Sequence, residues 1–338
     1  IPSAATIVPT ATTYTWTAPV VTGGVTGGSA QAVGQPNISQ TLTNPTNTPQ
    51  TATYTVTPTS GAAGACVGAN FTVTVTINPK PVIANQTPSI CSGAAFTITP
   101  ADGVPSAATI VPAGTTYTWA APVVTGGVTG ASAQAIPQPN ISQTLTNPTN
   151  AVQTVTYTVT PTSGASGACV GSNFTITVTV NPKPVIPAQT ATICSGAAFS
   201  ITPADGVPSA ATIVPAGTTY TWPAPVVSGG ITGGSAQLTG VASVSQTLTN
   251  PTSVVQTATY TVTPTSGAAG ACVGSTFTVT VTVNPKPVIA NQTTSICSGT
   301  AFSITPTDGL PTAATIVPLG TTYSWGAPVV TGRPLRFA

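Results

Sequence analysis

The sequence has no histidine and no methionine among its 338 residues, and only 2% of its residues are charged. Its side-chain carboxylates are Asp102, Asp205 and Asp308, which occupy one position in three successive repeats, and glutamate is absent. A hydrolase needs a general acid and a general base, most often histidine or a pair of carboxylates. We therefore expect no enzyme and no catalytic residue.

Positive charge is also too sparse to bind a polyanion. The net charge of +2 comes from three lysines and two arginines, which are Lys80, Lys183, Lys286, Arg333 and Arg336, against the three aspartates. Single lysines a whole domain apart cannot bind nucleic acid or an anionic membrane. No apolar run approaches the length of a membrane span, so we expect no membrane insertion. No basic-then-apolar leader precedes Ile1, and any targeting segment is expected outside this chain.

Metal and cofactor sites are not expected either. The cysteines lack the close spacing of a zinc site, and there is no histidine to assist them. The glycine-rich segment Val124–Gly130 has neither the lysine nor the following helix of a phosphate loop. Each aspartate lies in a Pro-(Ala/Thr)-Asp-Gly string, which is typical of a turn in which Asp hydrogen-bonds its own backbone. A calcium site would need more oxygen ligands.

What the sequence does contain is a repeat of 103 residues without slippage. The period is marked by Trp16, Trp119, Trp222 and Trp325, and by the cysteine series Cys66, Cys169, Cys272 and Cys91, Cys194, Cys297. One active site has no reason to be copied in register, whereas stalks, filaments and arrays of binding modules are built in this way. The period therefore favours a structural or adhesive role.

Residue patterns within one repeat predict strands and no helix. Threonine, valine, proline and glycine are abundant, and 41% of residues are hydrophobic, so the chain should fold into strands and turns. Phe174–Val180 alternates apolar residues with threonine and predicts a half-buried antiparallel strand. A second strand, Thr154–Thr160, would join it through the turn Pro161–Ser172 as a long hairpin.

Further strands complete an immunoglobulin-like unit. We expect them around Tyr117 and Trp119, Phe96 and Ile98, and Ile141 and Leu145, with a short edge strand at Val82–Ile83. About seven short strands predict an all-β protein of tandem immunoglobulin-like antiparallel β-sandwich domains in an extended array. The expected core residues are Trp16, Trp119, Trp222, Trp325, Tyr117, Tyr157 and Phe174.

The string Asn-Pro-Lys-Pro gives the domain frame, because proline is tolerated at strand ends and linkers but not in central strands. The joints are Pro79, Lys80 and Pro81, then Pro182, Lys183 and Pro184, and finally Pro285, Lys286 and Pro287, which we expect to act as semi-rigid spacers. This frame predicts complete domains at 80–182 and 183–285. Residues 1–79 lack their first strands, and 286–338 stop shortly after the tryptophan strand. These segments are called repeats 1 to 4 in chain order.

The six cysteines suit an oxidising compartment and leave three disulfide patterns open. Pairing within a repeat would join Cys91 to Cys169 and Cys194 to Cys272, stabilising each by about 4 to 5 kcal/mol in the chain-entropy model. Pairing across a joint would join Cys66 to Cys91 and Cys169 to Cys194. The third pattern joins Cys91 to Cys272, because the turn with Cys91 should lie near the hairpin of the following domain, and would lock neighbouring domains together.

Two segments depart from strict repetition. Residues Gln31–Asn37, Gln134–Asn140 and Gln237–Ser243 differ between copies, as surface loops do, through neutral drift or through ligand recognition. Arg333–Ala338 replaces the expected Gly-Val-Thr-Gly continuation, and we expect it to be a truncation or assembly artefact.

Three repeated strings resemble a known group of proteins. They are Ile-Cys-Ser-Gly at 90–93, 193–196 and 296–299, Thr-Tyr-Thr-Val-Thr-Pro-Thr at 53–59, 156–162 and 259–265, and Val-Thr-Val-Asn-Pro-Lys-Pro at 178–184 and 281–287. Together they resemble the PKD-like and Ig-like repeats of giant cell-surface adhesins in gliding Bacteroidetes-type bacteria. The resemblance implies long surface filaments exported by the type IX route and involved in gliding or attachment. The terminal export signal of that group is not present in these residues.

The expected function is therefore a structural stalk segment of an extracellular repeat adhesin or surface filament, which projects a distal element for attachment or gliding. One alternative is an array of modules that bind a glycan or protein through loops at one end. Another is an extracellular fibre subunit that self-assembles through its neutral faces. The expected partners are neighbouring repeats of the same chain, and other copies, a glycan or a protein ligand stay open. The expected location is extracellular, on the cell surface or in a secreted filament.

Overall fold

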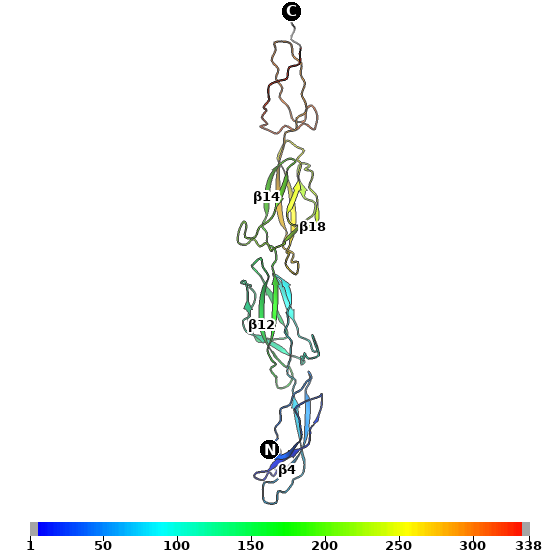
Figure 1. Ribbon diagram of the computed structural model, residues 1–338, viewed down its shortest axis with the longest axis vertical. Helices are drawn as coiled ribbons and strands as arrows, with labels where there is room; N and C mark the ends of the chain where they lie inside the picture. The colour runs from blue at the N-terminus through cyan, green and yellow to red at the C-terminus, as the bar shows by residue number, and fades with distance from the viewer. Residues whose placement is uncertain (1–5, 333–338) are drawn as a thin grey trace, which may run out of the picture. The chain divides into compact units, whose positions relative to one another are not determined.

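A computed structural model describes residues 6–332, which contain 21 β-strands and no helix (Figure 1). The predicted all-β class of tandem immunoglobulin-like domains is confirmed. The chain divides into two compact bodies, Ile1–Pro182 with repeats 1 and 2, and Lys183–Ala338 with repeats 3 and 4. The divergent segment Arg333–Ala338 lies outside the described residues. No membrane-spanning helix occurs within residues 6–332.

Repeat 2 is a β-sandwich of two unequal sheets. The larger sheet has the order β10-β8-β12-β13-β6, with β9 also pairing with β12. Its strands are β6 (Ser89–Cys91), β8 (Thr116–Trp119), β9 (Val123–Val124), β10 (Gln134–Gln138), β12 (Gln153–Thr162) and β13 (Phe174–Asn181). The smaller sheet pairs β7 (Ala94–Ile98) with β11 (Ile141–Leu145). The parallel pairing of β6 with β13 closes one edge of the larger sheet.

The predicted hairpin of repeat 2 is confirmed and its strands are slightly longer than expected. Tyr157 on β12 lies opposite Ile176 on β13 in an antiparallel register. The apolar members of both strands are buried, whereas the alternating threonines are half-exposed on the other face. The period-two pattern of the sequence thus places one face of the hairpin in the core.

Two expectations about the sheet edges were wrong. Val82–Ile83 forms no strand, and only an isolated bridge links Val82 to Ile110. The segment Gln134–Asn140, expected to be a loop, contains the edge strand β10, as do its counterparts β3 (Gln31–Gln35) and β18 (Gln237–Val241). An edge strand pairs on one side alone, so it tolerates Pro137 and the sequence variation that suggested a loop.

Repeat 3 has the same architecture as repeat 2. Its strands are β14 (Gln189–Cys194), β15 (Ala198–Ile201), β16 (Thr219–Trp222), β17 (Val226–Val227), β18, β19 (Val244–Thr247), β20 (Gln256–Thr265) and β21 (Phe277–Asn284). β14 is longer than its counterpart β6 and pairs with β21 over six residues. Repeat 3 has Ala191 where repeat 2 has Pro88, and proline has no N–H to extend a strand.

Repeat 1 contains only part of this sandwich. Its sheet has the order β2-β4-β1-β3, with β5 pairing with β4. The strands are β1 (Thr13–Trp16), β2 (Val20–Val21), β3, β4 (Gln50–Thr59) and β5 (Phe71–Ile77). No described residue corresponds to β6 or β7, and residues 38–42, the counterpart of β11, form no strand. The core has four buried residues, against 14 in each of repeats 2 and 3.

Repeat 4 forms no strand between residues 289 and 332, the orange-to-red part of Figure 1. Trp325, predicted to be a core residue, is 87% exposed. The prediction failed because Trp119 in repeat 2 is covered by β12 and β13, and the described residues of repeat 4 include no counterpart of that hairpin. The other predicted core residues, Trp16, Trp119, Trp222, Tyr117, Tyr157 and Phe174, are buried.

Candidate functional site

A partly buried polar network joins the polar ends of two core aromatic side chains in each sandwich. In repeat 2 the Tyr157 hydroxyl donates a hydrogen bond to Gln143 Oε1 at 2.7 Å. The same oxygen accepts the Ser132 N–H at 3.0 Å, and Gln143 Nε2 donates to the Ser132 carbonyl at 2.9 Å. Trp119 Nε1 donates to that carbonyl at 2.9 Å. The network satisfies the polar ends of both aromatic side chains, so its role is to support packing.

Burial makes five of the tyrosines weaker acids. Desolvation raises the pKa of Tyr117, Tyr220 and Tyr260 to about 12, and raises the pKa of Tyr157 and Tyr54 as well. A phenol with a raised pKa stays protonated at neutral pH and serves as a hydrogen-bond donor. These groups are therefore unsuited to act as a general base near neutral pH.

The repeated aspartates organise turns, although not in the predicted manner. Asp102 Oδ1 accepts the N–H of Val111 at 2.9 Å, nine residues further along the chain, and Asp308 accepts that of Val317 at 2.8 Å. The expectation of a bond to the neighbouring backbone was wrong, because the loop folds back to the carboxylate. Within residues 6–332 no three His, Cys, Asp or Glu side chains gather closely enough to hold a metal ion.

The joint between repeats 1 and 2 is packed rather than freely exposed. Pro79 and Pro81 are buried, whereas Lys80 between them is exposed. The Asn78 amide lies close to Gly167, which belongs to the β12–β13 loop of the next repeat and has a positive φ of 92°. Gly171 in the same loop contacts the Pro81 carbonyl so closely that a Cβ atom would overlap it. The loop of repeat 2 is thereby fitted around the joint.

A polar contact also links repeats 3 and 4 within the second body. Ser253 Oγ donates to Asp308 Oδ2 at 2.9 Å across the third joint. A shallow groove of about 490 Å³ lies beside it, lined on one side by residues such as Asn250 and on the other by residues such as Val288. Pro285 is half-buried, while Lys286 and Pro287 are exposed. This joint therefore buries less of its proline pair than the joint between repeats 1 and 2 does.

The cysteines do not follow two of the three predicted patterns. Cys91 and Cys272 are each disulfide-bonded, whereas Cys66, Cys169, Cys194 and Cys297 are free thiols. The pairs predicted within a repeat, Cys91 with Cys169 and Cys194 with Cys272, are therefore wrong. The pairs predicted across a joint, Cys66 with Cys91 and Cys169 with Cys194, are wrong for the same reason.

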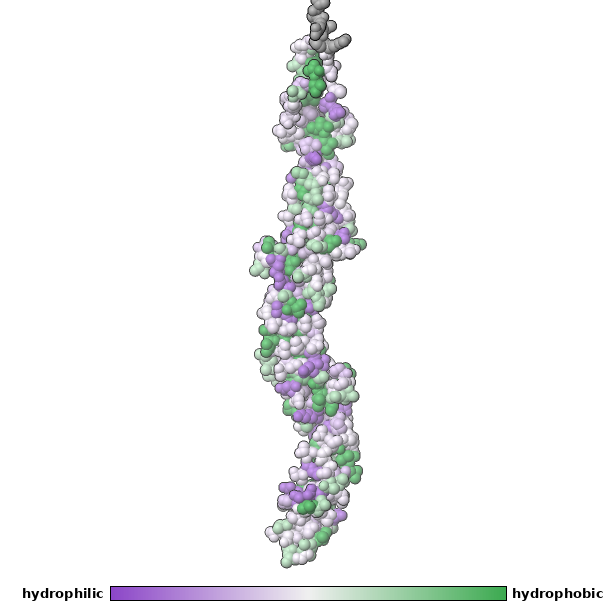
Figure 2. Space-filling view, in the orientation of Figure 1, coloured by the Kyte–Doolittle hydropathy of each residue, from purple (hydrophilic) through white to green (hydrophobic). Residues whose placement is uncertain are grey.

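The variable edge strands expose large apolar side chains. Val33 on β3 is 69% exposed, Ile136 on β10 is 71% exposed and Leu238 on β18 is 82% exposed. Elsewhere the visible surface in Figure 2 is mostly of intermediate hydropathy, in keeping with the small number of charged residues. Single exposed apolar residues are common on protein surfaces and do not by themselves indicate a binding site.

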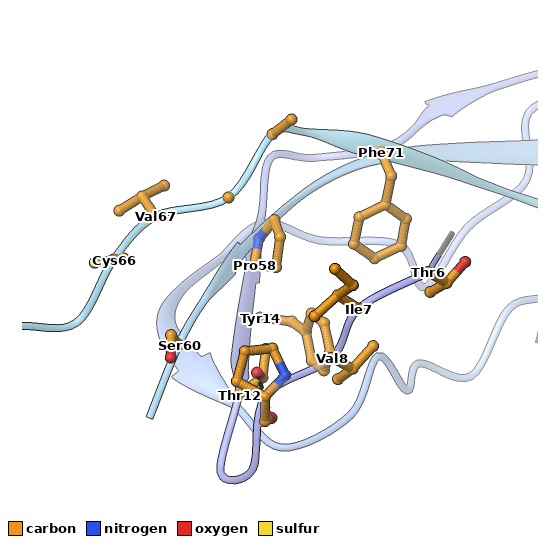
Figure 3. A pocket seen from close by; sticks show the side chains of 13 residues that line it. Thr6, Ile7, Val8, Thr12, Tyr14, Pro58, Ser60, Cys66, Val67 and Phe71 are labelled. Carbon is orange, nitrogen blue, oxygen red and sulfur yellow. Dashed lines mark hydrogen bonds between the residues drawn. The ribbon is translucent and has the colours of Figure 1, made fainter. Parts of the chain in front are cut away.

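Sequence reasoning missed a groove in repeat 1, which Figure 3 shows. It has a volume of about 690 Å³ and apolar walls that include Ile7, Val8, Tyr14, Pro58 and Phe71. Ile7 is 87% exposed, and Phe71 is 40% exposed although its counterpart Phe174 was predicted to be a core residue and is buried. The groove lies at Gly68, whose counterpart Gly171 in repeat 2 packs against the Pro81 carbonyl.

Three segments of the chain, residues 3–81, 88–184 and 191–287, match the family model described as a PKD-like domain. No curated protein matches the chain. Similar solved structures include the FN1–FN3 domains of chicken CNTN1, at 11% identity and a TM-score of 0.28, covering 81% of this chain and 89% of that one. An I-band fragment of titin has 8% identity, a TM-score of 0.26 and coverage of 82% and 89%. Three N-terminal domains of the bacteriophage RB49 Highly Immunogenic Outer Capsid protein have 11% identity, a TM-score of 0.30 and coverage of 83% and 90%.

Proposed function

Because the chain belongs to the PKD-like domain family, we propose that it is a structural stalk segment of an extracellular repeat adhesin or surface filament. In this role the tandem β-sandwich domains project a distal element, and no repeat carries out chemistry. The domain frame that we propose places complete domains at 80–182 and 183–285, with partial repeats at 1–79 and 286–338. The proposed location is the cell surface or a secreted filament of a bacterium.

The observation that carries the proposal is the packing of the joints. Pro79 and Pro81 are buried at one joint, and Ser253 bonds to Asp308 across another. Two prolines with fixed φ and a packed neighbouring loop restrict the motion of one domain against the next. A spacer that transmits position or force benefits from such joints, whereas a string of independent binding modules does not require them.

We also propose that Cys91 pairs with Cys272. Cys91 lies opposite Asn181 in the β6–β13 pair, at the end of repeat 2 that leads into the joint. Cys272 lies in the β20–β21 loop of repeat 3, where Gly274 packs against the Pro184 carbonyl at the start of that repeat. Only two residues, Pro182 and Lys183, lie between Asn181 and Pro184 along the chain. Both cysteines are disulfide-bonded.

A binding experiment separates the stalk from the runner-up, an array of glycan- or protein-binding modules. The full chain, immobilised through one end, is exposed to a glycan array and to a panel of extracellular matrix proteins. The stalk proposal expects no saturable binding. Saturable binding that is weakened by Ile136→Ser or Leu238→Ser on the edge strands, and unchanged by Val329→Ser elsewhere on the surface, would favour the binding modules instead.

A further inference from the structure

We propose that glutamine side chains close the edge strands of this protein to pairing with other chains, and that β18 in repeat 3 is the edge they protect least. Two copies of the chain then associate side by side through β18. The inference goes beyond the proposed stalk function, because it identifies the part of a repeat that controls lateral association. It rests on hydrogen bonds within repeats 1 to 3 and on one strand in which these repeats differ.

The larger sheet of each repeat ends in a strand that pairs on one side. β3, β10 and β18 stand last in the strand order of their sheets, and no strand among residues 6–332 pairs with their outer side. Such an edge offers main-chain N–H and C=O groups to a strand of another molecule, and proteins often protect it with charged side chains. None of these three strands contains a charged residue, so any protection comes from uncharged groups.

The middle of each edge strand departs from regular pairing. In repeat 2 Gln134 pairs with Trp119 and Gln138 pairs with Tyr117, so a step of four residues along β10 matches a step of two along β8. β3 and β18 have the same irregularity. A bulge leaves residues without a partner in the ladder. Ile136 lies in the middle of this bulge and is 71% exposed.

Two glutamines bind the main chain at this point in repeats 1 and 2. Gln134 Nε2 and Gln138 Nε2 donate to the Ile136 carbonyl at 3.0 and 3.2 Å. β3 has the same pair of bonds, both at 3.2 Å, to the Val33 carbonyl. A carbonyl oxygen has two lone pairs, so the two amides take both of its acceptor positions. A strand from another molecule would have to displace these side chains before it could bind this carbonyl.

The same carbonyl is less protected in repeat 3. The Thr239 carbonyl accepts one glutamine side chain, from Gln237 Nε2 at 2.8 Å. The position of the second glutamine is taken by Val241, which packs against the core instead. One acceptor position of the Thr239 carbonyl is therefore not occupied by a side chain.

Two further differences make β18 the more accessible edge. Gly240 stands where β10 has Pro137, and proline at an edge disfavours pairing because it has no N–H to donate. Leu238 is 82% exposed and stands where β10 has the small side chain of Ala135. β18 thus combines an available acceptor, a main chain that can donate and an exposed apolar side chain.

The strand that fits this edge is β18 of a second copy. Two identical strands can pair in antiparallel fashion about a two-fold axis, so the contact is isologous and closes as a dimer. Neither copy brings a charge to the contact, so no like charges repel across it. Burial of Leu238 in both copies adds apolar area to the main-chain hydrogen bonds.

The test exchanges the two edge sequences within the full chain, whose free thiols are first alkylated to prevent intermolecular disulfides. The first variant places the β10 sequence in repeat 3, through Leu238→Ala, Thr239→Ile, Gly240→Pro and Val241→Gln. The second variant places the β18 sequence in repeat 2, through Ala135→Leu, Ile136→Thr, Pro137→Gly and Gln138→Val. Each sequence already forms this strand in a repeat of the same architecture, so both variants should fold. The control is Ala135→Leu alone, which exposes a leucine but keeps both glutamines and the proline.

Sedimentation velocity over a series of concentrations measures the association constant. We expect the original chain to form a dimer and the first variant to associate more weakly by about fivefold for each main-chain hydrogen bond lost. The second variant has two accessible edges in each chain, so it should form assemblies longer than a dimer. The Ala135→Leu control should behave like the original chain.

Three results would overturn the proposal. The first is equal association of the original chain and the first variant, including a monomeric state of both. The second is a variant with the β18 sequence in repeat 2 that assembles no further than the original chain. The third is long assemblies of the Ala135→Leu control, because the exposed leucine and not the loss of a glutamine would then drive association. None of these results bears on the stalk function, which the binding experiment tests separately.

Discussion

At the scale of single residues, the buried tyrosines make the stability of the sandwich depend on pH. Burial raises the pKa of Tyr117 to about 12, so the neutral phenol is favoured in the folded state. The unfolded chain loses this proton near pH 10, while the folded chain retains it. The contribution of protonated Tyr117 to the free energy of unfolding is therefore fully present below about pH 10 and is lost as the pH rises toward 12.

We predict that Tyr117→Phe reduces the alkaline loss of stability. Between pH 9 and pH 11.5, ionisation of a tyrosine whose pKa is raised from 10 to about 12 should lower the free energy of unfolding by about 2 kcal/mol. Urea unfolding followed by tryptophan fluorescence measures the difference. The control is Tyr323→Phe, at a side chain that is 45% exposed and belongs to none of the three core clusters. Equal pH profiles for the original chain and Tyr117→Phe would contradict the prediction.

The polar network illustrates which residue contacts a sequence can reveal. The burial of Tyr157 followed from its place in a period-two strand. Its bond to Gln143 did not, because the two residues belong to different sheets and their approach depends on how the sheets pack. The link from Asp102 to Val111 was missed for a similar reason, since the loop between them follows no simple periodicity. Long-range polar contacts are therefore found only once the fold is known.

At the scale of strands, closely similar sequences have different surroundings in different repeats. β13 in repeat 2 has neighbours on both edges, whereas β5 in repeat 1 has a neighbour on one edge among residues 6–332. The hairpin pattern was sufficient to predict both strands. The extra strand on the edge of β13 was not predicted, because β6 has three residues and is preceded by Pro88. Short strands that pair in parallel carry too little pattern to be recognised.

This difference predicts unequal effects of one substitution. Phe174→Ala should destabilise repeat 2 by about 3 to 5 kcal/mol, because it leaves a cavity in a closed core. Phe71→Ala at the matching position of repeat 1 should cost less than half as much, since that ring is 40% exposed. Native-state hydrogen exchange of the β12–β13 and β4–β5 amides measures each repeat separately. Equal losses of protection would show that repeat 1 is closed in solution.

At the scale of the whole molecule, the scarcity of charge sets how the chain responds to salt. Because only 2% of the residues are charged and the net charge is +2, charges on neighbouring repeats attract or repel one another weakly. Added salt therefore has few interactions to screen. We predict that the hydrodynamic radius of the chain is the same in 20 mM and 1 M sodium chloride, to within about 5% given these weak forces. A marked change in radius, measured by dynamic light scattering, would mean that charge contributes to the joints.

The 103-residue period also accounts for which cysteines are bonded. The proposed partners Cys91 and Cys272 are 181 residues apart, and no other two cysteines of the chain have this spacing. Non-reducing peptide mapping should therefore recover one cross-linked pair of peptides, with Cys169 and Cys194 alkylated as free thiols. Cys91→Ser should release Cys272 as a fifth free thiol, and Cys169→Ser should leave the bond intact.

The consequence for stability depends on where the cross-link acts. Cys91 and Cys272 belong to repeats with separate cores, so loss of the bond should leave the unfolding of each core nearly unchanged. It should instead increase hydrogen exchange in the β20–β21 loop, where Cys272 follows Ala271 with its φ of 43°. A large drop in the stability of repeat 2 or 3 after Cys91→Ser would instead indicate a bond that supports one sandwich rather than the joint.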